Sequence, residues 1–163
     1  MHIPKLLIFY TLLISNVLFS AHAWAGEKLT KGSKWEVTGK IELPPGKAGI
    51  FYQHAKPVAA ISGDQYSPWC RLVFKATSKE PRVISKGQYE ITRVLYNDEA
   101  VNPTQISYKT TMRLKPIGSP GTAILHQIVC GRWDDNTGSY LSVKEIRQAL
   151  EGVMRLEIST VKK

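Results

Sequence analysis

Hydrophobic and polar residues alternate along much of the chain, and the alternation is strictest between Ile106 and Lys115. Every second position there is polar, and three of those positions are basic: Lys109, Arg113 and Lys115. A period of two places successive side chains on opposite faces of a β-strand. We therefore predict a strand with one buried face and one positively charged face.

Shorter segments of the same kind predict a mostly β protein. Alternating or apolar runs bounded by Gly, Pro, Asn or Asp mark expected strands at 35–43, 49–53, 57–61, 69–76, 82–84, 88–96, 106–114, 122–130 and 154–158. Chain breaks are expected at 97–99 and at Asn102-Pro103. About eight short strands separated by such turns predict a β-sandwich or a partly closed β-barrel.

One helix is predicted near the C-terminus. Ser142 is an expected N-cap, and Glu145 stands three residues later, which is the spacing of a capping box. Leu141 and Ile146 are placed as a hydrophobic staple, and Gly152 favours an end to the helix. We expect this helix to cover an open end of the sheet.

The first 25 residues have the pattern of a cleaved secretory signal peptide. Lys5 precedes an uncharged run at 6–19, and the small residues Ala23 and Ala25 follow, so cleavage is expected after Ala25. A membrane anchor is the alternative, but Asn16 interrupts the run, which is shorter than the ~20 residues that span a bilayer. Residues 26–163 are expected to form a single β-rich domain with a flexible start and no transmembrane segment.

The chain has two cysteines, Cys70 and Cys130, and both lie on apolar faces of expected strands. An exported chain meets an oxidising environment, so we predict a disulfide between them and a periplasmic or secreted location. Closing this loop would stabilise the fold by about 4 kcal/mol in the chain-entropy model. Two buried free thiols are the alternative interpretation.

The formal net charge is +9, and the basic residues are spread along the chain. Such a charge favours anionic partners, for example lipid headgroups, cell-wall polymers, lipopolysaccharide or an acidic protein. Lys109, Arg113 and Lys115 form the candidate anion-binding face, with a solvated sheet face as the alternative. Nucleic acid is not expected, because the chain is exported and its aromatic residues are not arranged as a stacking platform.

The sequence gives little support for catalysis. His126 shares an expected apolar face with Ile124 and Ile128, which favours a structural imidazole over a catalytic one. The segment 134–138 resembles a fragment of a calcium loop but lacks its bidentate glutamate, so a β-turn is predicted. We expect no catalytic residue, no metal site and no cofactor. A small hydrolase with a site near His126 is the least favoured hypothesis.

The chain carries Pro68-Trp69-Cys70, then Gln-Tyr-Glu-Ile-Thr-Arg-Val at 88–94, then Cys130 ahead of a late helix. This order resembles a family of small uncharacterised periplasmic (envelope) proteins of Gram-negative bacteria. The resemblance implies periplasmic residence and transfers no site residue.

The leading functional hypothesis is a non-catalytic periplasmic binding or accessory protein that acts through its surface, within an envelope assembly. An envelope protein or an anionic envelope component is the expected partner, and the sequence specifies no oligomeric state. The alternative is an inhibitor or modulator of an enzyme. Such a protein would present a loop at 54–56 or at 134–140.

Overall fold

The computed structural model describes residues 27–59, 64–118, 124–134 and 138–159. The expected signal peptide at 1–25 lies outside the described residues. The elements are β1 (Lys34–Val37), β2 (Ile41–Leu43), β3 (Gly49–Gln53), β4 (Lys56–Val58), β5 (Trp69–Phe74), β6 (Arg82–Ile84), β7 (Gln88–Asn102), β8 (Gln105–Ile117), β9 (Leu125–Asp134), α1 (Val143–Ala149) and β10 (Met154–Glu157).

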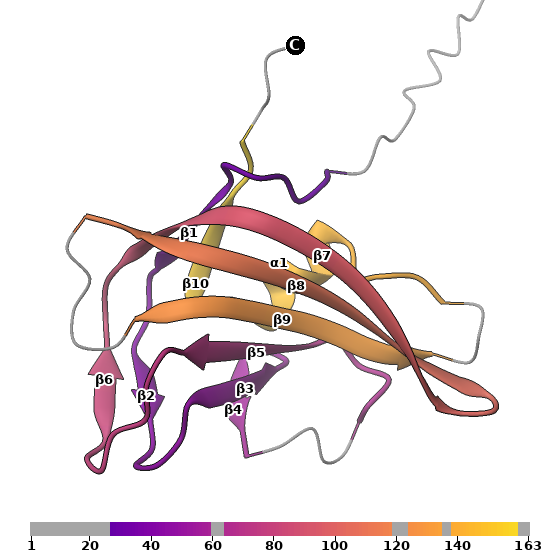
Figure 1. Cartoon of the computed structure of the whole chain (residues 1–163), viewed down its shortest axis with the longest axis horizontal. Helices are drawn as coiled ribbons and strands as arrows, with labels where there is room; N and C mark the ends of the chain where they lie inside the picture. The colour runs from indigo at the N-terminus through magenta and orange to yellow at the C-terminus, as the bar shows by residue number, and fades with distance from the viewer. Residues whose placement is uncertain (1–26, 60–63, 119–123, 135–137, 160–163) are drawn as a thin grey trace, which may run out of the picture.

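Eight of the strands form one antiparallel sheet in the order β10-β1-β7-β8-β9-β5-β3-β4. The sheet curls into a half-barrel, and α1 lies behind β7, β8 and β9 in the view of Figure 1. β2 and β6 pair with each other in a separate two-stranded sheet. The predicted mostly β fold, a partly closed barrel with one late helix, is therefore confirmed. The strands differ from the expectation in length, because β7 and β8 form a long hairpin.

The hydrophobic core lies between the inner face of this sheet, α1 and the β2–β6 pair. Alternate residues of the strands point into it, as the period of two predicts. Complete burial of a large aliphatic or aromatic side chain contributes roughly 1.5–3 kcal/mol relative to exposure. The largest fully buried side chains include Trp35, Ile41, Leu72, Phe74, Ile91, Met112, Ile128 and Ile146.

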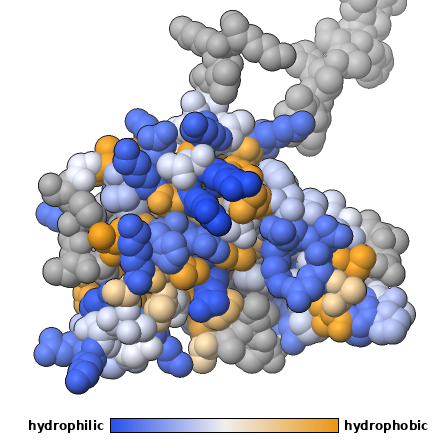
Figure 2. All heavy atoms as spheres, viewed as in Figure 1, coloured by the Kyte–Doolittle hydropathy of each residue, from blue (hydrophilic) through white to orange (hydrophobic). Residues whose placement is uncertain are grey.

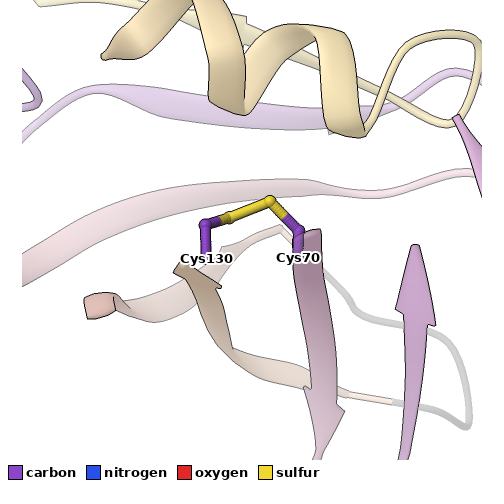
Figure 3. Close-up of a disulfide and its surroundings, with 2 residues drawn as sticks. All are labelled: Cys70 and Cys130. Carbon is purple, nitrogen blue, oxygen red and sulfur yellow. A yellow bond between two sulfur atoms is a disulfide. The ribbon is translucent and has the colours of Figure 1, made fainter. Parts of the chain in front are cut away.

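The predicted disulfide is present and joins Cys70 of β5 to Cys130 of β9. The two residues stand directly opposite each other in the register of these strands, with their Cα atoms 4.0 Å apart. Both are fully buried, and the bond lies on the side of the sheet that faces α1 (Figure 3). The cross-link therefore closes a loop between neighbouring strands that are 60 residues apart in sequence.

The predicted strand at 35–43 is two strands in different sheets. β1 ends at Val37 and β2 begins at Ile41, and Gly39 lies between them. A Cβ atom at Gly39 would lie 2.1 Å from the carbonyl oxygen of Gly152, so only glycine permits this approach. The chain turns here because a distant segment packs against its backbone.

The strand break predicted at 97–99 is wrong, since β7 continues to Asn102 and pairs with β8 along this stretch. Cross-strand pairing outweighs the turn propensity of Asn97 and Asp98. The break expected at Asn102-Pro103 is confirmed, and the side chain of Asn102 accepts a hydrogen bond from the backbone N–H of Thr104 at 3.0 Å. This contact closes the hairpin that joins β7 to β8.

The chain before β1 is packed against the domain, which corrects the expectation of a flexible start. Leu29 and Ser33 are buried, and the carboxylate of Glu27 accepts hydrogen bonds from the guanidinium of Arg147 on α1. Arg147 also donates to the backbone carbonyl of Leu156 in β10 at 3.2 Å. The N-terminal segment, the helix and the edge strand β10 are thus held together by one arginine.

The predicted helix start is confirmed. Ser142 caps α1, and its side chain accepts from the Glu145 backbone while the Glu145 carboxylate accepts from the Ser142 backbone N–H at 2.8 Å. Partial burial acts to raise the pKa of Glu145, but the Ser142 hydrogen bonds and the Arg132 guanidinium outweigh it and leave the pKa below its ordinary value. Arg132, on β9, donates to Glu145 at 2.9 Å. The cap therefore also anchors the helix to the sheet.

We expect Glu145→Ala to lower the free energy of unfolding by about 1 kcal/mol at neutral pH, because a capping bond and a charge-assisted bond are lost together. The pKa of Glu145 is lower in the folded state than in the unfolded state. This stabilisation is therefore present above the unfolded pKa and is lost as the pH falls through the lower folded pKa. Urea unfolding at pH 7 and at pH 3 measures it.

Glu151→Ala is the control for this change, because Glu151 is exposed just beyond α1. The stability difference between wild type and Glu145→Ala should shrink at the acidic pH, whereas the control should change little at either pH. A difference that stays the same at both pH values would show that the charge of Glu145 contributes nothing.

Candidate functional site

The three basic residues predicted as an anion-binding face all lie on the outer face of β8. Arg113 and Lys115 are exposed, while the ammonium of Lys109 contacts the carboxylate of Glu99 at 2.6 Å. The hydrogen bond and the charge of Lys109 lower the pKa of the Glu99 carboxyl. The three residues thus share a face, but Lys109 has a partner and the other two have no ion pair with a described residue.

Arg93 joins this face, and the sequence pattern did not reveal it. Arg93 stands directly opposite Arg113 in the β7–β8 register. The pairing shifts between Ile91 and Arg93, and the hydroxyl of Thr92 donates to the Arg113 carbonyl at 3.1 Å. This bulge turns Arg93 outward while Ile91 remains buried. Two guanidinium groups therefore project side by side from the hairpin.

A pocket opens on the same face, nearer the β3 side of the sheet. Its volume is about 560 Å³. We name it the outer pocket, and its lining includes Phe51, Trp69, Arg71, Glu99, Lys109 and Trp133. In Figure 2, which looks at the side of the sheet away from α1, hydrophobic residues lie among hydrophilic ones. Aromatic and charged residues line the same hollow.

Gly131 lies between two residues that line the outer pocket. It lies directly opposite Trp69 on one side and Lys109 on the other. A Cβ atom at this position would lie 2.5 Å from the Tyr108 carbonyl oxygen and 3.0 Å from Cζ2 of Trp69. The absence of a side chain lets the indole of Trp69 lie across the strand, where it is 4% exposed.

Two more aromatic contacts define the wall formed by β3 and β5. The rings of Phe51 and Trp69 meet edge to face with centroids 5.9 Å apart. The guanidinium carbon of Arg71 lies 5.2 Å from the centre of the Phe51 ring, a cation–π contact. Arg71 is exposed and forms no ion pair with a described residue. Its guanidinium lies beside Gly49, so Arg71 borders both the outer pocket and the neighbouring hollow beside the β3–β4 hairpin.

Two buried polar atoms belong to residues that line the outer pocket. Nε1 of Trp69 and Oγ of Ser107 are buried and lack a hydrogen-bond partner among the described residues. Such groups are uncommon in native proteins, because leaving one unsatisfied costs about 1–3 kcal/mol. A larger hollow of about 720 Å³ beside the β3–β4 hairpin has no such group among its described lining residues. The outer pocket is therefore the stronger candidate.

His126 does not lie in a continuous apolar row. The β5–β9 register shifts where Phe74 pairs with Leu125, so Leu125 is buried in place of Ile124. The prediction that His126 shares an inward face with Ile124 is wrong for that reason, because a bulge adds one residue to the strand. His126 is half-buried, and its Nδ1 has no described hydrogen-bond partner.

The remaining sequence candidates are dispersed. His54 is exposed in the turn after β3, and both His54 and Ala55 have positive φ angles of 50° and 60°. The turn predicted at 134–138 falls partly outside the described residues. Within the described ranges no three His, Cys, Asp or Glu side chains gather in a group that could hold a metal ion. No described helix is both long and apolar enough to cross a membrane.

Fold and site together define a mostly β protein with a disulfide-linked half-barrel, one packed helix and an aromatic pocket on a basic outer face. Comparison of the chain with protein-family models, curated proteins and solved structures finds no significant match. The disulfide is compatible with an extracytoplasmic location.

Proposed function

We propose that this chain is a non-catalytic binding or accessory protein of the periplasm, and that it recognises an anionic envelope component through the outer face of its sheet. The observation that carries the proposal is the set of cations on this face. Only Lys109 has an ion pair with a described residue. The other basic residues of the face are Arg71, Arg93, Arg113 and Lys115.

Physical reasoning supports a binding role for such a face. Like charges placed opposite each other in a sheet, as Arg93 and Arg113 are, destabilise the fold. An anion bound between them would remove this repulsion and gain charge-assisted hydrogen bonds. The expected signal peptide, the disulfide and the resemblance to small envelope proteins support the periplasm as the place of action.

Charge reversal tests this proposal. We expect Arg113→Glu/Lys115→Glu to weaken binding of residues 26–163 to phosphatidylglycerol vesicles or to lipopolysaccharide at least ~10-fold at low salt, because each basic residue near an anionic surface contributes about 1 kcal/mol. Co-sedimentation at low and moderate salt measures it, and wild-type binding should fall as salt rises.

Lys31→Glu/Lys144→Glu is the matched control, since it changes the net charge equally. Lys31 is exposed in the turn before β1, and Lys144 is exposed on α1. Equal losses in both double variants would assign the binding to net charge and overturn the role of the outer face. Wild-type protein that binds neither target at low salt would overturn recognition of these anions.

A second candidate function is inhibition or modulation of an enzyme, favoured by the turn at His54 and Ala55. Positive φ at two consecutive non-glycine residues is uncommon, and it restricts the backbone of this turn to a narrow set of conformations. A preorganised exposed turn at a sheet edge is suited to insertion into a partner's cleft. His54→Ala would abolish binding to such an enzyme, whereas the charge reversals on β8 would leave it unchanged.

A further inference from the structure

The outer pocket combines aromatic walls, cations and hydrogen-bonding groups in one hollow. We propose that it binds a single pyranose ring that carries a carboxylate or a phosphate group. The inference rests on the proposed function, because it assigns the chemistry of the anionic component that the outer face recognises. It follows from three features of the lining.

The first feature is the set of aromatic rings. Phe51, Trp69 and Trp133 come from β3, β5 and β9, and their side chains line the same hollow. The faces of aromatic rings carry partial negative charge, so they attract the slightly positive C–H groups of a sugar ring face. Trp133 is half-buried, and its backbone N–H donates to the carbonyl of Gln65 at 2.9 Å, which fixes this wall.

The second feature is the supply of hydrogen-bonding groups around those rings. Glu99 is an acceptor and Lys109 a donor at one side of the pocket, and they are already held together at 2.6 Å. Ser107 and Trp69 also line the pocket, but Oγ of Ser107 and Nε1 of Trp69 are buried beneath its surface and would pair with a ligand only after a local shift. A sugar has several hydroxyl groups that both donate and accept, so one ring can pair with donors and acceptors together.

The third feature is Arg71, which selects for a negative charge. Its guanidinium lies over the Phe51 ring and is exposed without an ion pair to a described residue. A planar guanidinium binds carboxylate and phosphate with two parallel hydrogen bonds. Stacking on Phe51 orders the side chain beforehand, which reduces the entropy lost on binding. An acidic group beside the sugar ring would therefore be recognised here.

The same lining disfavours a fatty acyl chain. Arg71, Glu99 and Lys109 all line the hollow, and an alkyl chain placed there would remove water from these charges without replacing its hydrogen bonds. A sugar acid supplies such hydrogen bonds. The two groups of sugar acids that fit are a carboxylated sugar, as found in cell-wall glycan, and a phosphorylated sugar, as found in lipid-linked glycan.

Ligand-observed saturation-transfer NMR on residues 26–163 tests the proposal. The probes are N-acetylmuramic acid for the carboxylated sugar and glucosamine 1-phosphate for the phosphorylated one, with neutral N-acetylglucosamine and inorganic phosphate as controls. We expect a dissociation constant on the order of 1 mM for one acidic sugar, since the ligand is small. The neutral sugar and inorganic phosphate should each bind at least ~10-fold more weakly, because each lacks one of the two recognised parts.

Two variants locate the binding. Trp133→Ala should weaken the acidic sugar at least ~10-fold, and Arg71→Gln should remove the preference for the acidic over the neutral sugar. Tyr96→Ala and Lys75→Gln are the matched controls, because both residues are exposed and neither lines the outer pocket. Circular dichroism melting confirms that each variant is folded. The proposal is overturned if Trp133→Ala leaves the affinity for the acidic sugar unchanged and Arg71→Gln leaves the preference for the acidic sugar unchanged.

The outcomes separate this inference from the proposed function. If neither sugar acid binds while lipopolysaccharide or anionic vesicles still bind in a β8-dependent way, the sugar site is refuted and the basic face stands. Inorganic phosphate that binds as tightly as the sugar acids also refutes the sugar site. If the sugar acid binds and neither the vesicles nor lipopolysaccharide bind, the pocket is correct and the role of Arg113 and Lys115 is refuted.

Discussion

We expect Cys70→Ala/Cys130→Ala to lower the free energy of unfolding by about 4 kcal/mol, the largest effect of any change considered for this chain. The bond closes a loop between residues 60 apart, so its removal releases much conformational entropy in the unfolded state. Both cysteines are fully buried among core residues, and the smaller alanines also leave unfilled space there. A loss of this size is a large part of the total stability of a small domain.

Guanidinium unfolding of the oxidised wild type and of the double variant measures the loss. Wild type treated with a reducing agent should lose a similar amount, whereas the same reagent should leave the double variant unchanged. A difference below about 1 kcal/mol would show that the two strands are held in register without the cross-link, and would contradict the entropic argument.

Local patterns predicted much of this fold. The alternation between Ile106 and Leu114 identified the inner face of β8, where Thr110, Met112 and Leu114 are buried. The spacing of Ser142 and Glu145 identified the capping box at the start of α1. These features could be predicted because side-chain period and cap chemistry act between residues that are close in sequence.

The failed predictions concern contacts between distant segments. The break at Gly39 is set by the backbone of Gly152, more than a hundred residues away. The bulges at Thr92 and near His126 are set by strand pairing, which changes the face of every residue beyond them. No short stretch of sequence contains this information, so Arg93 was missed and His126 was placed in the wrong row.

The outer pocket also depends on contacts between distant segments, but the sequence did contain one signal that points to it. Phe51, Trp69 and Trp133 belong to three strands, and only the sheet register brings them together. A disulfide between adjacent antiparallel strands fixes that register, however. Once Cys70 faces Cys130, Trp69 must face Gly131, as the structure shows. The predicted disulfide could therefore also have predicted that Trp69 lies opposite Gly131.

That pair gives the second large effect, because we expect Gly131→Ala to lower the free energy of unfolding by about 2 kcal/mol. The added Cβ would lie 2.5 Å from the Tyr108 carbonyl oxygen, which belongs to the backbone of β8, and 3.0 Å from the Trp69 ring. The backbone and the indole must both move to relieve these contacts. The Trp69 ring would then shift in the lining of the outer pocket, and we expect the sugar binding proposed there to weaken.

A double-mutant cycle with Trp69→Leu separates the two contacts. If the indole accounts for part of the strain, Gly131→Ala should cost less in the Trp69→Leu background, and the remaining cost should belong to the Tyr108 carbonyl. Val129→Ile is the matched control, since it enlarges a half-buried side chain on the same face of β9. Gly131→Ala that is as stable as wild type by urea unfolding would contradict the close packing of Trp69 across β9. The packing bears on the proposed sugar site because the same indole is part of the lining of the outer pocket.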